Sequence, residues 1–366
     1  MIKSCSFWQC LFFAFLLLSA CNNKSVEKPT ELVTIKVASE IRLRIADIFE
    51  EPEIIELEQC DSCLMGDINK VVKDDSGFYI LDRNRAEAIF KFDLEGNFIF
   101  KIDTKGEGPG QYKLPFDFDL LENGLELFIL DMNSRKFLVF DKTTGSFIRE
   151  FSYSTFQVEN FIAFSNDLFA VEVDGRNTVS EKENLGHIVN FVSKDTIFKG
   201  VLDYPKTVVM FYGQEFTKSQ HSFLFSRALN DTIYSVLENE FKPKYFLDFG
   251  DRKVSIDLKV LDIMELGQGI QKEASFFSLG RNFENNKYLI FSWANEKEYE
   301  QHGIYFKGKN EFYQLLSENS LFRNPFFMDE ESVFTFYSNT DRNFSPLPNE
   351  YIQKENFYLA RFLFKD

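Results

Sequence analysis

A repeat of about 49 residues is the feature of this sequence that most restricts its fold. The segments GFYILDRNRAEAIFKFDLEGNFIFKI (Gly77–Ile102) and ELFILDMNSRKFLVFDKTTGSFIREF (Glu126–Phe151) share one pattern. In both, one apolar run ends in Ile-Leu-Asp, a second ends in Phe-Asp, and a glycine precedes a third run that begins with Phe-Ile. These marks recur after 49, 48 and 49 residues. A nearly constant period of this length is typical of architectures in which one unit cannot bury its faces alone.

Each unit predicts antiparallel strands joined by tight turns. Aspartate at the end of a run bonds the backbone of the following turn, and Gly96 and Gly145 permit the positive φ that hairpins need. A short run precedes each copy, DINKVV (67–72) and FDFDLL (116–121). With it, the unit has four strands, which is the blade of a β-propeller.

More diverged units follow at similar spacing, in residues 161–202, 221–250, 276–316 and 325–364. Six blades of about 50 residues need about 300 residues, which matches the length from Ile54 to Phe364. We therefore predict an all-β fold over residues 41–366, a six-bladed β-propeller of four-stranded antiparallel blades. The run EIIELE (Glu53–Glu58) lacks a neighbour in the first blade, so we expect it to complete the last blade and close the ring.

Composition agrees with this fold. Aromatic residues make up 17% of the chain, with 45 Phe and 14 Tyr, and these residues favour pleated, half-buried surfaces. Helical periodicity is scarce, and Val254–Ile270 is the best candidate for a helix. The formal net charge is −16. A strongly acidic chain without a basic run has no electrostatic route to nucleic acid, so we exclude nucleic-acid binding.

Residues 1–20 predict an export signal. Lys3 supplies a positive charge, and CLFFAFLLLSA (Cys10–Ala20) is an apolar run too short to span a bilayer. The sequence LLSAC resembles the bacterial lipobox, in which Cys21 would carry the lipid. Residues 21–40 are predicted as the lipidated cysteine and a flexible tether. We expect an exported protein that is anchored by lipid to the outer membrane. Whether it lies on the periplasmic face or on the surface face of that membrane is left open.

Two cysteines, Cys60 and Cys63, remain in the predicted domain. A zinc site needs four ligands, or three and a water. A redox Cys-x-x-C needs a helix N-terminus that lowers the thiol pKa, whereas these residues lie between two strand-like runs. In an oxidising compartment we therefore predict a local disulfide.

The glycine-rich stretch KGEGPGQY (Lys105–Tyr112) has the look of a phosphate-binding loop. Such a loop must leave a strand and open a helix, whose N-terminus supplies the amide donors. Here Pro109 interrupts the glycines and KLPFDFDLL (113–121) predicts a short strand. We therefore interpret the stretch as the joint between the first two blades, with Tyr112 packed over it.

The stretch GEGPGQY, together with NDTIYSV and KPKYFLDFG (residues 230–236 and 242–250), resembles the six-bladed β-propeller lipoproteins of Bacteroidetes. The resemblance covers nearly the whole predicted mature chain. It implies an NHL- or TolB-like propeller in the cell envelope. Members mostly lack an assigned activity, so it carries over no catalytic residue.

The residues suited to chemistry are scattered. His187, His221 and His302 fall in three predicted blades, and nothing in the sequence pairs them with a nucleophile. We predict no catalytic residue, resident metal or cofactor. Arg281 and Arg323 lie near the predicted starts of innermost strands, where they could receive an anionic or glycan ligand at the channel mouth. A salt bridge to one of the 57 acidic residues is the simpler interpretation.

Three functional hypotheses stay open. The leading one is a binding module for an envelope protein partner or for a glycan or peptide ligand, because a ring with many loops and an anchor needs no catalytic group. The alternative is a hydrolase or lactonase centred on the channel, in which Asp119, Asn160 and Asn324 could gather a metal if their strands converge. The third is a structural component of the envelope.

Overall fold

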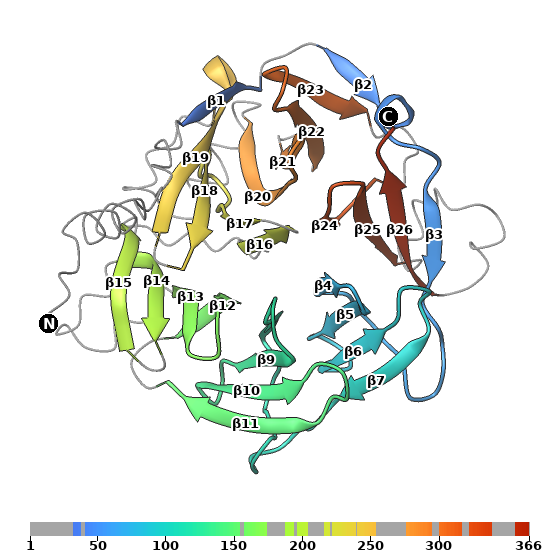
Figure 1. Cartoon of the computed structure of the whole chain (residues 1–366), viewed down its shortest axis with the longest axis vertical. Helices are drawn as coiled ribbons and strands as arrows, with labels where there is room; N and C mark the ends of the chain where they lie inside the picture. Colours follow the sequence, from blue (N-terminus) through green and yellow to red (C-terminus); the bar gives the residue numbers. More distant parts are fainter. Residues whose placement is uncertain are drawn as a thin grey trace, which may run out of the picture. The chain divides into compact units, whose positions relative to one another are not determined.

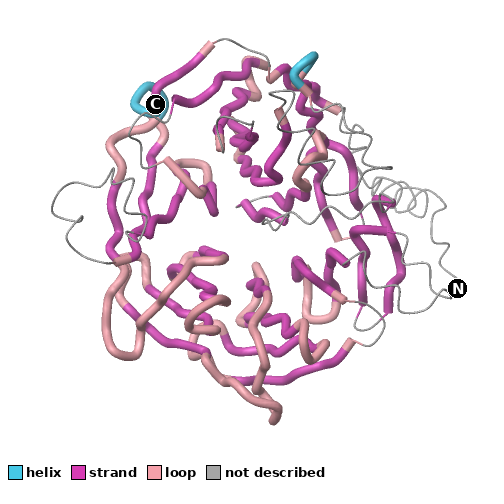
Figure 2. The backbone as a smooth tube through the Cα atoms, turned by 180° about the vertical axis from the view of Figure 1, so that it is seen from behind, coloured by secondary structure: helices cyan, strands magenta, loops and turns pink. Residues whose placement is uncertain are grey.

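A computed structural model describes residues 32–37, 41–153, 157–173, 187–193, 196–203, 216–219, 222–238, 240–253, 276–294, 300–316, 322–338 and 356–365. The unit that begins at Val33 consists of six sheets arranged around a central axis (Figure 1). Helix is limited, in this part of the chain, to α2 (Ile45–Ile48) and a 3-10 turn at Gly250–Arg252, both at the rim (Figure 2). The predicted six-bladed propeller is thus confirmed. The candidate helix Val254–Ile270 lies outside the described residues.

Blades 1 to 3 follow one another along the chain, each with its first strand innermost. Blade 1 consists of β4 (Lys70–Asp74), β5 (Gly77–Asp82), β6 (Ala88–Phe92) and β7 (Phe98–Ile102). Blade 2 consists of β8 (Asp117–Leu120), β9 (Glu126–Asp131), β10 (Lys136–Asp141) and β11 (Phe147–Ser152). Blade 3 consists of β12 (Val158–Ala163), β13 (Leu168–Val173), β14 (His187–Ser193) and β15 (Thr196–Asp203).

Blades 4 to 6 repeat this order but include strands from the start of the unit. Blade 4 contains β16 (Phe216–Ser219), β17 (Ser222–Phe225), β18 (Thr232–Leu237) and β19 (Glu240–Asp248). Blade 5 contains β20 (Phe277–Glu284), β21 (Tyr288–Ala294), β22 (Gln301–Phe306) and β23 (Glu311–Leu316). Blade 6 contains β24 (Pro325–Met328), β25 (Ser332–Ser338), β26 (Phe357–Leu363) and β3 (Glu53–Glu56).

The described residues before blade 1, 33–37 and 41–56, run along the outer edges of blades 4, 5 and 6, and we call them the N-terminal strap. Strand β1 (Val33–Lys36) pairs in parallel with β19, and β2 (Arg42–Arg44) pairs in parallel with β23. Strand β3 pairs antiparallel with β26, so the predicted ring closure is confirmed. Two expectations need correction. Blades 4 and 5 have a fifth strand, and Val33–Lys36 belongs to a sheet rather than to the tether predicted over residues 21–40.

The inner strands form a closed ring around the axis. Each inner strand contacts the next, and β24 contacts β4. Because neighbouring strands within a blade are antiparallel, all crossings between blades reach one face, which we call the entry face. In blades 1 and 2, the turns between the first and second strands, and between the third and fourth, lie on the opposite face, which we call the hairpin face. The β12–β13 turn of blade 3 lies on the same face.

The hydrophobic core is divided among the six interfaces between neighbouring blades. Six buried clusters each combine side chains of two adjacent blades. Along β5, Phe78 and Ile80 pack toward blade 6, whereas Tyr79 and Leu81 pack toward blade 2. Both faces of each sheet are therefore buried, which explains why an aromatic-rich sequence suits this architecture.

The repeated aspartates hold the turns as the sequence predicts. The Asp82 carboxylate accepts hydrogen bonds from the backbone N–H groups of Gly66, Asp67 and Arg85, at 2.7, 3.1 and 2.9 Å. Asp131 holds the corresponding turn of blade 2 in the same way. Each carboxylate therefore fixes both a hairpin of its own blade and the segment that enters that blade.

Candidate functional site

The central channel is narrow and lined by side chains of the inner strands. Its described walls leave a cavity of about 20 Å³, lined among others by Val71, Asp119 and Phe326. That volume holds little more than one water molecule, since a water needs about 10–15 Å³. This cavity therefore has no room for an organic substrate.

The channel acids of blade 2 are bonded to their neighbours. Asp117 accepts a hydrogen bond from Lys70 Nζ at 2.7 Å and another from the backbone N–H of Phe161 at 3.2 Å. Asp119 accepts one from the backbone N–H of Ala163 at 2.9 Å. These carboxylates thus satisfy donors on the free edge of the next inner strand, a role that explains their burial.

The three residues suggested for a metal have separate partners. Asp119 bonds the β12 backbone, Asn160 donates to Glu172 at 2.8 Å, and Asn324 accepts from Arg281 at 3.1 Å. No group of three or more His, Cys, Asp or Glu side chains suited to a metal occurs among the described residues. Each polar group therefore has a structural role in the described geometry.

The structure brings the two predicted mouth arginines into one neighbourhood on the entry face. Arg281, on β20, lies 3.5 Å from the Glu300 carboxylate and donates to Asn324. Both Arg281 and Arg323 lie close enough to His302 to lower its pKa electrostatically. The salt bridge that the sequence suggests for Arg281 is therefore present, and it leaves that side chain 35% exposed.

The structure distinguishes His302 from the other histidines, although the sequence does not. Its Nδ1 lies 2.9 Å from the Ser292 hydroxyl, and its Nε2 lies 3.9 Å from Glu300. Burial lowers the pKa of His302, an effect that Glu300 opposes, so the imidazole is neutral at neutral pH. A serine, a histidine and a carboxylate thus follow one another, but Ser292 is fully buried on β21. Because the two strands pair so that Ser292 faces His302, the contact follows from strand register.

The other two histidines do not join this group. His187 begins β14, and its ring lies against Gly200 of the paired strand. His221 lies outside the described residues. The expectation that histidines occupy strand positions is thus met for His187 and His302.

The backbone N–H groups of the glycine-rich stretch donate to side chains of the protein. The backbone N–H of Gly108 donates to the Gln111 side chain at 2.8 Å, and that of Gly110 donates to Glu150 of β11 at 3.0 Å. The buried Tyr112 hydroxyl donates to the carbonyl oxygens of Ile102 and Glu87. The stretch is therefore a joint that ties blade 1 to blade 2, and no helix follows it within the described part.

Two buried charge networks escape sequence analysis. In blade 1, Lys91 Nζ donates to Ser76, lies 3.6 Å from Asp74 and sits 3.8 Å from the centroid of the Tyr79 ring. Burial lowers the pKa of Lys91 to about 8, although Asp74 opposes the shift. No local pattern marks this lysine, because its partners come from another strand and a turn.

The second network joins blades 4 and 5 around Glu284. Its carboxylate accepts hydrogen bonds from Lys244 at 2.5 Å, Lys307 at 2.7 Å and the Tyr245 hydroxyl at 2.8 Å. Burial alone would raise the pKa of Glu284, but the two lysines lower it below its ordinary value. This network connects three strands, β19, β20 and the end of β22, and stabilises the interface.

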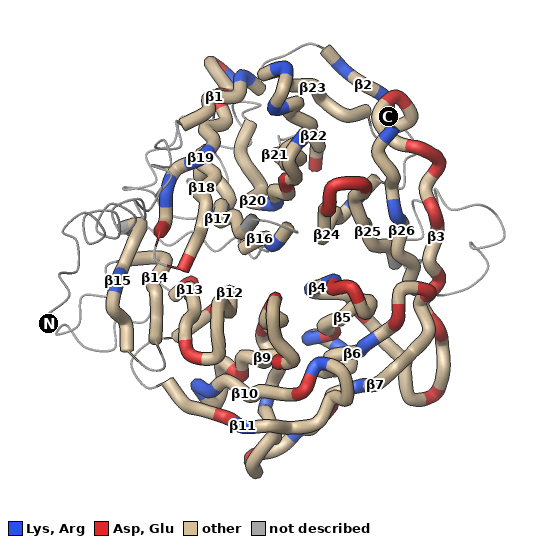
Figure 3. Tube along the Cα trace, viewed as in Figure 1, with Lys and Arg blue, Asp and Glu red and all other residues tan. Residues whose placement is uncertain are grey.

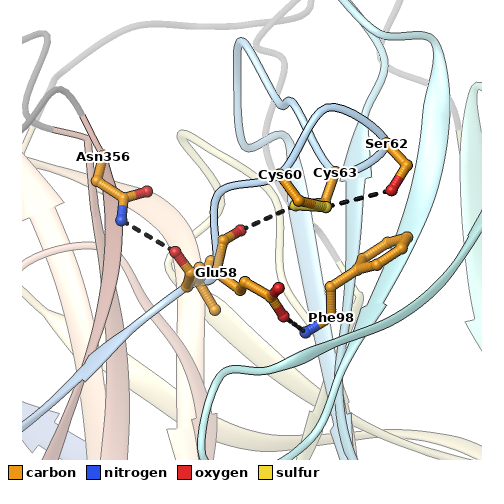
Figure 4. Close-up of a disulfide and its surroundings, with 7 residues drawn as sticks. Glu58, Cys60, Ser62, Cys63, Phe98 and Asn356 are labelled. Atoms are coloured by element: carbon orange, nitrogen blue, oxygen red, sulfur yellow. Dashed lines mark hydrogen bonds between the residues drawn. A yellow bond between two sulfur atoms is a disulfide. The ribbon is translucent and has the colours of Figure 1, made fainter.

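The loop before blade 1 carries the two cysteines (Figure 4). Cys60 and Cys63 are joined in the structure, with their Cα atoms 5.0 Å apart. Beside them, the Glu58 carboxylate accepts a hydrogen bond from the backbone N–H of Phe98 at 2.8 Å, so the loop is held against β7. The predicted lipidation site, Cys21, lies outside the described residues.

Charge is distributed around the ring, with basic and acidic residues interspersed along the blades (Figure 3).

None of the helices in the described part is long and apolar enough to cross a membrane.

Comparisons with known proteins agree on the fold. The family model described as "Domain of unknown function (DUF4934)" matches residues 32–361. A candidate exported protein from Bacteroides fragilis has a TM-score of 0.73 and 15% identity, with 92% of this chain and 100% of that chain covered. A member of the DUF4221 family from Bacteroides vulgatus has a TM-score of 0.54 and 12% identity, with 87% and 97% covered. No curated protein matches the sequence.

Proposed function

The chain belongs to the DUF4934 family, and we propose that it is an exported, lipid-anchored propeller that binds an envelope protein or an extracellular ligand. Fold and family leave the function open, because propellers serve many unrelated roles. The proposal therefore rests on the N-terminal sequence and on the site geometry.

Export and anchoring are supported by the N-terminus. The apolar run Cys10–Ala20, followed by Cys21, has the order of a lipoprotein signal, and a protein with the same fold is described as exported. We assign the outer membrane as the destination. Replacement of Cys21 by Ala should move the protein from the membrane fraction to the soluble fraction and abolish incorporation of labelled fatty acid. Retention of the label by the variant would refute lipidation at this residue.

The small volume of the described channel cavity is the observation that carries the binding role. Its described walls leave about 20 Å³, and its acids Asp117 and Asp119 are engaged by backbone donors. We therefore expect a partner to meet the outer surfaces of the ring, where loops and turns of several blades are available for contact. A rigid ring that holds such loops is suited to recognition.

Affinity purification of the full, lipidated protein tests this role. A tagged form would be extracted in mild detergent, with an unrelated lipoprotein of the same cell as control bait, and the associated proteins identified by mass spectrometry. A stoichiometric companion that is absent from the control supports the binding role. A purified protein that has no companion, and that turns over a small substrate, would contradict it.

One observation favours the alternative of a hydrolase. The Ser292 hydroxyl and His302 lie in hydrogen-bonding distance, and Glu300 is on the other side of the imidazole. A nucleophile must be reached by its substrate, however, and Ser292 is fully buried. If ester or lactone hydrolysis is found, a Ser292→Ala variant should abolish it; activity that survives the substitution removes this candidate.

A further inference from the structure

A groove on the hairpin face has a lining that suggests a partner. It has a volume of about 580 Å³, and its walls come from the β8–β9 turn, the β12–β13 turn and the strands β17 and β18. Three blades, 2, 3 and 4, therefore contribute to it. The volume falls in the range of roughly 300–1,000 Å³ that is usual for binding sites. We call this recess the blade 2–4 groove.

The groove has an apolar lining. Leu121, Phe164, Phe223 and Leu237 are its large apolar residues, and the rings of Phe164 and Phe223 meet edge to face with their centroids 5.5 Å apart. Leu237 is 49% exposed although it is large and apolar. An apolar side chain from a partner would cover these groups and remove their surface from water.

The rim of the groove is acidic. Glu122, Asp167 and Glu238 lie along it, and none of the eleven residues that line the groove is a lysine or arginine. Lys218 borders the groove: its Nζ donates to the carbonyl oxygen of Leu120 at 2.8 Å and lies 5.2 Å from the centroid of the Phe223 ring. The groove therefore combines aromatic and aliphatic carbon with an excess of negative charge.

We propose that the blade 2–4 groove binds an extended segment of a protein partner in which basic and apolar side chains alternate. Apolar side chains would contact the floor formed by Phe164, Phe223 and Leu237. Lysine or arginine side chains would meet the rim acids, and an arginine could also lie over an aromatic ring. This inference deepens the proposed binding role and rests on it, because it names the surface and the chemistry of the partner.

Fluorescence anisotropy with the intact propeller provides a direct test. The probe is a short fluorescein-labelled peptide of alternating lysine and phenylalanine; peptides of lysine with serine, and of glutamate with phenylalanine, serve as comparisons. The groove variant is Leu237→Ser with Glu238→Lys. Its control, Leu94→Ser with Glu95→Lys, makes the same changes at adjacent exposed positions in the β6–β7 turn of blade 1, where Leu94 is 40% exposed.

The lysine–phenylalanine peptide should bind the unchanged protein more tightly than either comparison peptide. The groove variant should weaken binding about tenfold or more, and the control variant less than about twofold. Equal losses in the two variants, or equal binding of the lysine–serine peptide, would show that the peptide is attracted only by the net negative charge, and would overturn the inference.

The partner purification separates this inference from the proposed function. If a companion is lost from the groove variant and kept by the control, the groove is its binding surface. If the companion stays with both variants, the binding role stands and the groove inference is overturned. If the unchanged protein binds the peptide at the groove but also turns over a substrate, the groove inference is supported. In that case the proposal that binding is the main function is contradicted.

Discussion

Blades 1 and 2 are each built from one continuous stretch of chain, whereas blades 4, 5 and 6 take their outermost strand from the N-terminal strap. In blades 1 and 2, β7 and β11 are the last strands of the sheets, and the repeated aspartates hold the turns. In blades 4 to 6, the strap covers sheet edges that belong to segments more than 180 residues farther along the chain. Local sequence therefore suffices to specify the first pair, but the other three depend on distant segments.

Loss of a single side chain of the N-terminal strap should lower the stability more than loss of one from the outermost strand of blade 2. Phe49 is 1% exposed and packs against Phe322, Phe362 and Phe364. Phe49→Ala should lower the free energy of unfolding by about 3–5 kcal/mol, measured by denaturant titration. Phe147→Ala, in the outermost strand of blade 2 where the ring is 40% exposed, should lower it by less than about 1 kcal/mol. Equal effects would remove the distinction between the two halves.

The charge network between blades 4 and 5 should make the strapped half sensitive to acid. The pKa of Glu284 is lowered in the folded state, so its contribution to stability is present above the ordinary carboxyl pKa, about 4.3, and is lost as the pH falls through the lowered value. Glu284→Gln should lower stability at neutral pH by about 3 kcal/mol, because Lys244 and Lys307 would lose their buried partner. It should also flatten the acid limb of a plot of stability against pH. An unchanged acid limb would show that other carboxylates dominate it.

The stability of blades 1 and 2 should depend on their turn aspartates. Asp82→Ala would leave three backbone N–H groups without their acceptor, so we expect a loss of about 2–3 kcal/mol in unfolding free energy. Asp329→Ala in blade 6, where the carboxylate is only partly buried and serves a local turn, should lose about 1 kcal/mol. The comparison is made by chemical denaturation of both variants. A larger loss of stability for Asp329→Ala than for Asp82→Ala would show that blade 1 does not depend on its turn aspartate more than blade 6 does.

Lys91 should make the stability of blade 1 depend on pH in the alkaline range, where Glu284 does not titrate. Burial lowers its pKa to about 8 in the folded state, whereas an unfolded lysine titrates near about 10.4. Between these values the unfolded state holds more protons, so the stability of the folded protein rises with pH by about 3 kcal/mol, at about 1.4 kcal/mol per pKa unit. Lys91→Met should remove that rise, and Lys242→Met, at a side chain that is 54% exposed, should leave it intact. A rise that persists in the Lys91 variant would locate the titration elsewhere.

The fold could be predicted from sequence because its marks are local. Asp82, Asp131 and the hairpin glycines repeat at fixed spacing, and they set the turns that define a blade. The pairing of Glu53–Glu56 with the last blade followed from an unpartnered strand and the need to cover an edge. The fifth strands were missed, because Val33–Lys36 and Arg42–Arg44 pair in parallel with strands that carry no local sign of it.

The candidate site was less predictable for a physical reason. Arg281 and Glu300 were within reach of inference because a buried or half-buried arginine tends to find an acid. The Ser292–His302 contact depends on which residues face each other across β21 and β22, and a shift of the register by one residue would separate them. The blade 2–4 groove depends on two turns and the ends of two strands from three blades, whose distances no periodicity encodes.

Ring closure has a consequence for the order in which this chain can fold. The Asn356 side chain donates to the carbonyl oxygen of Leu57 at 2.9 Å, a contact that spans 299 residues. A ribosome delivers Leu57 long before Asn356, so the strand that closes the ring must wait for nearly the whole protein to be made. Contacts of this separation slow folding, and until they form, the free edge of β3 can pair with other strands. A nascent chain that stops before blade 6 can therefore form blades 1 and 2, but it can never become a ring.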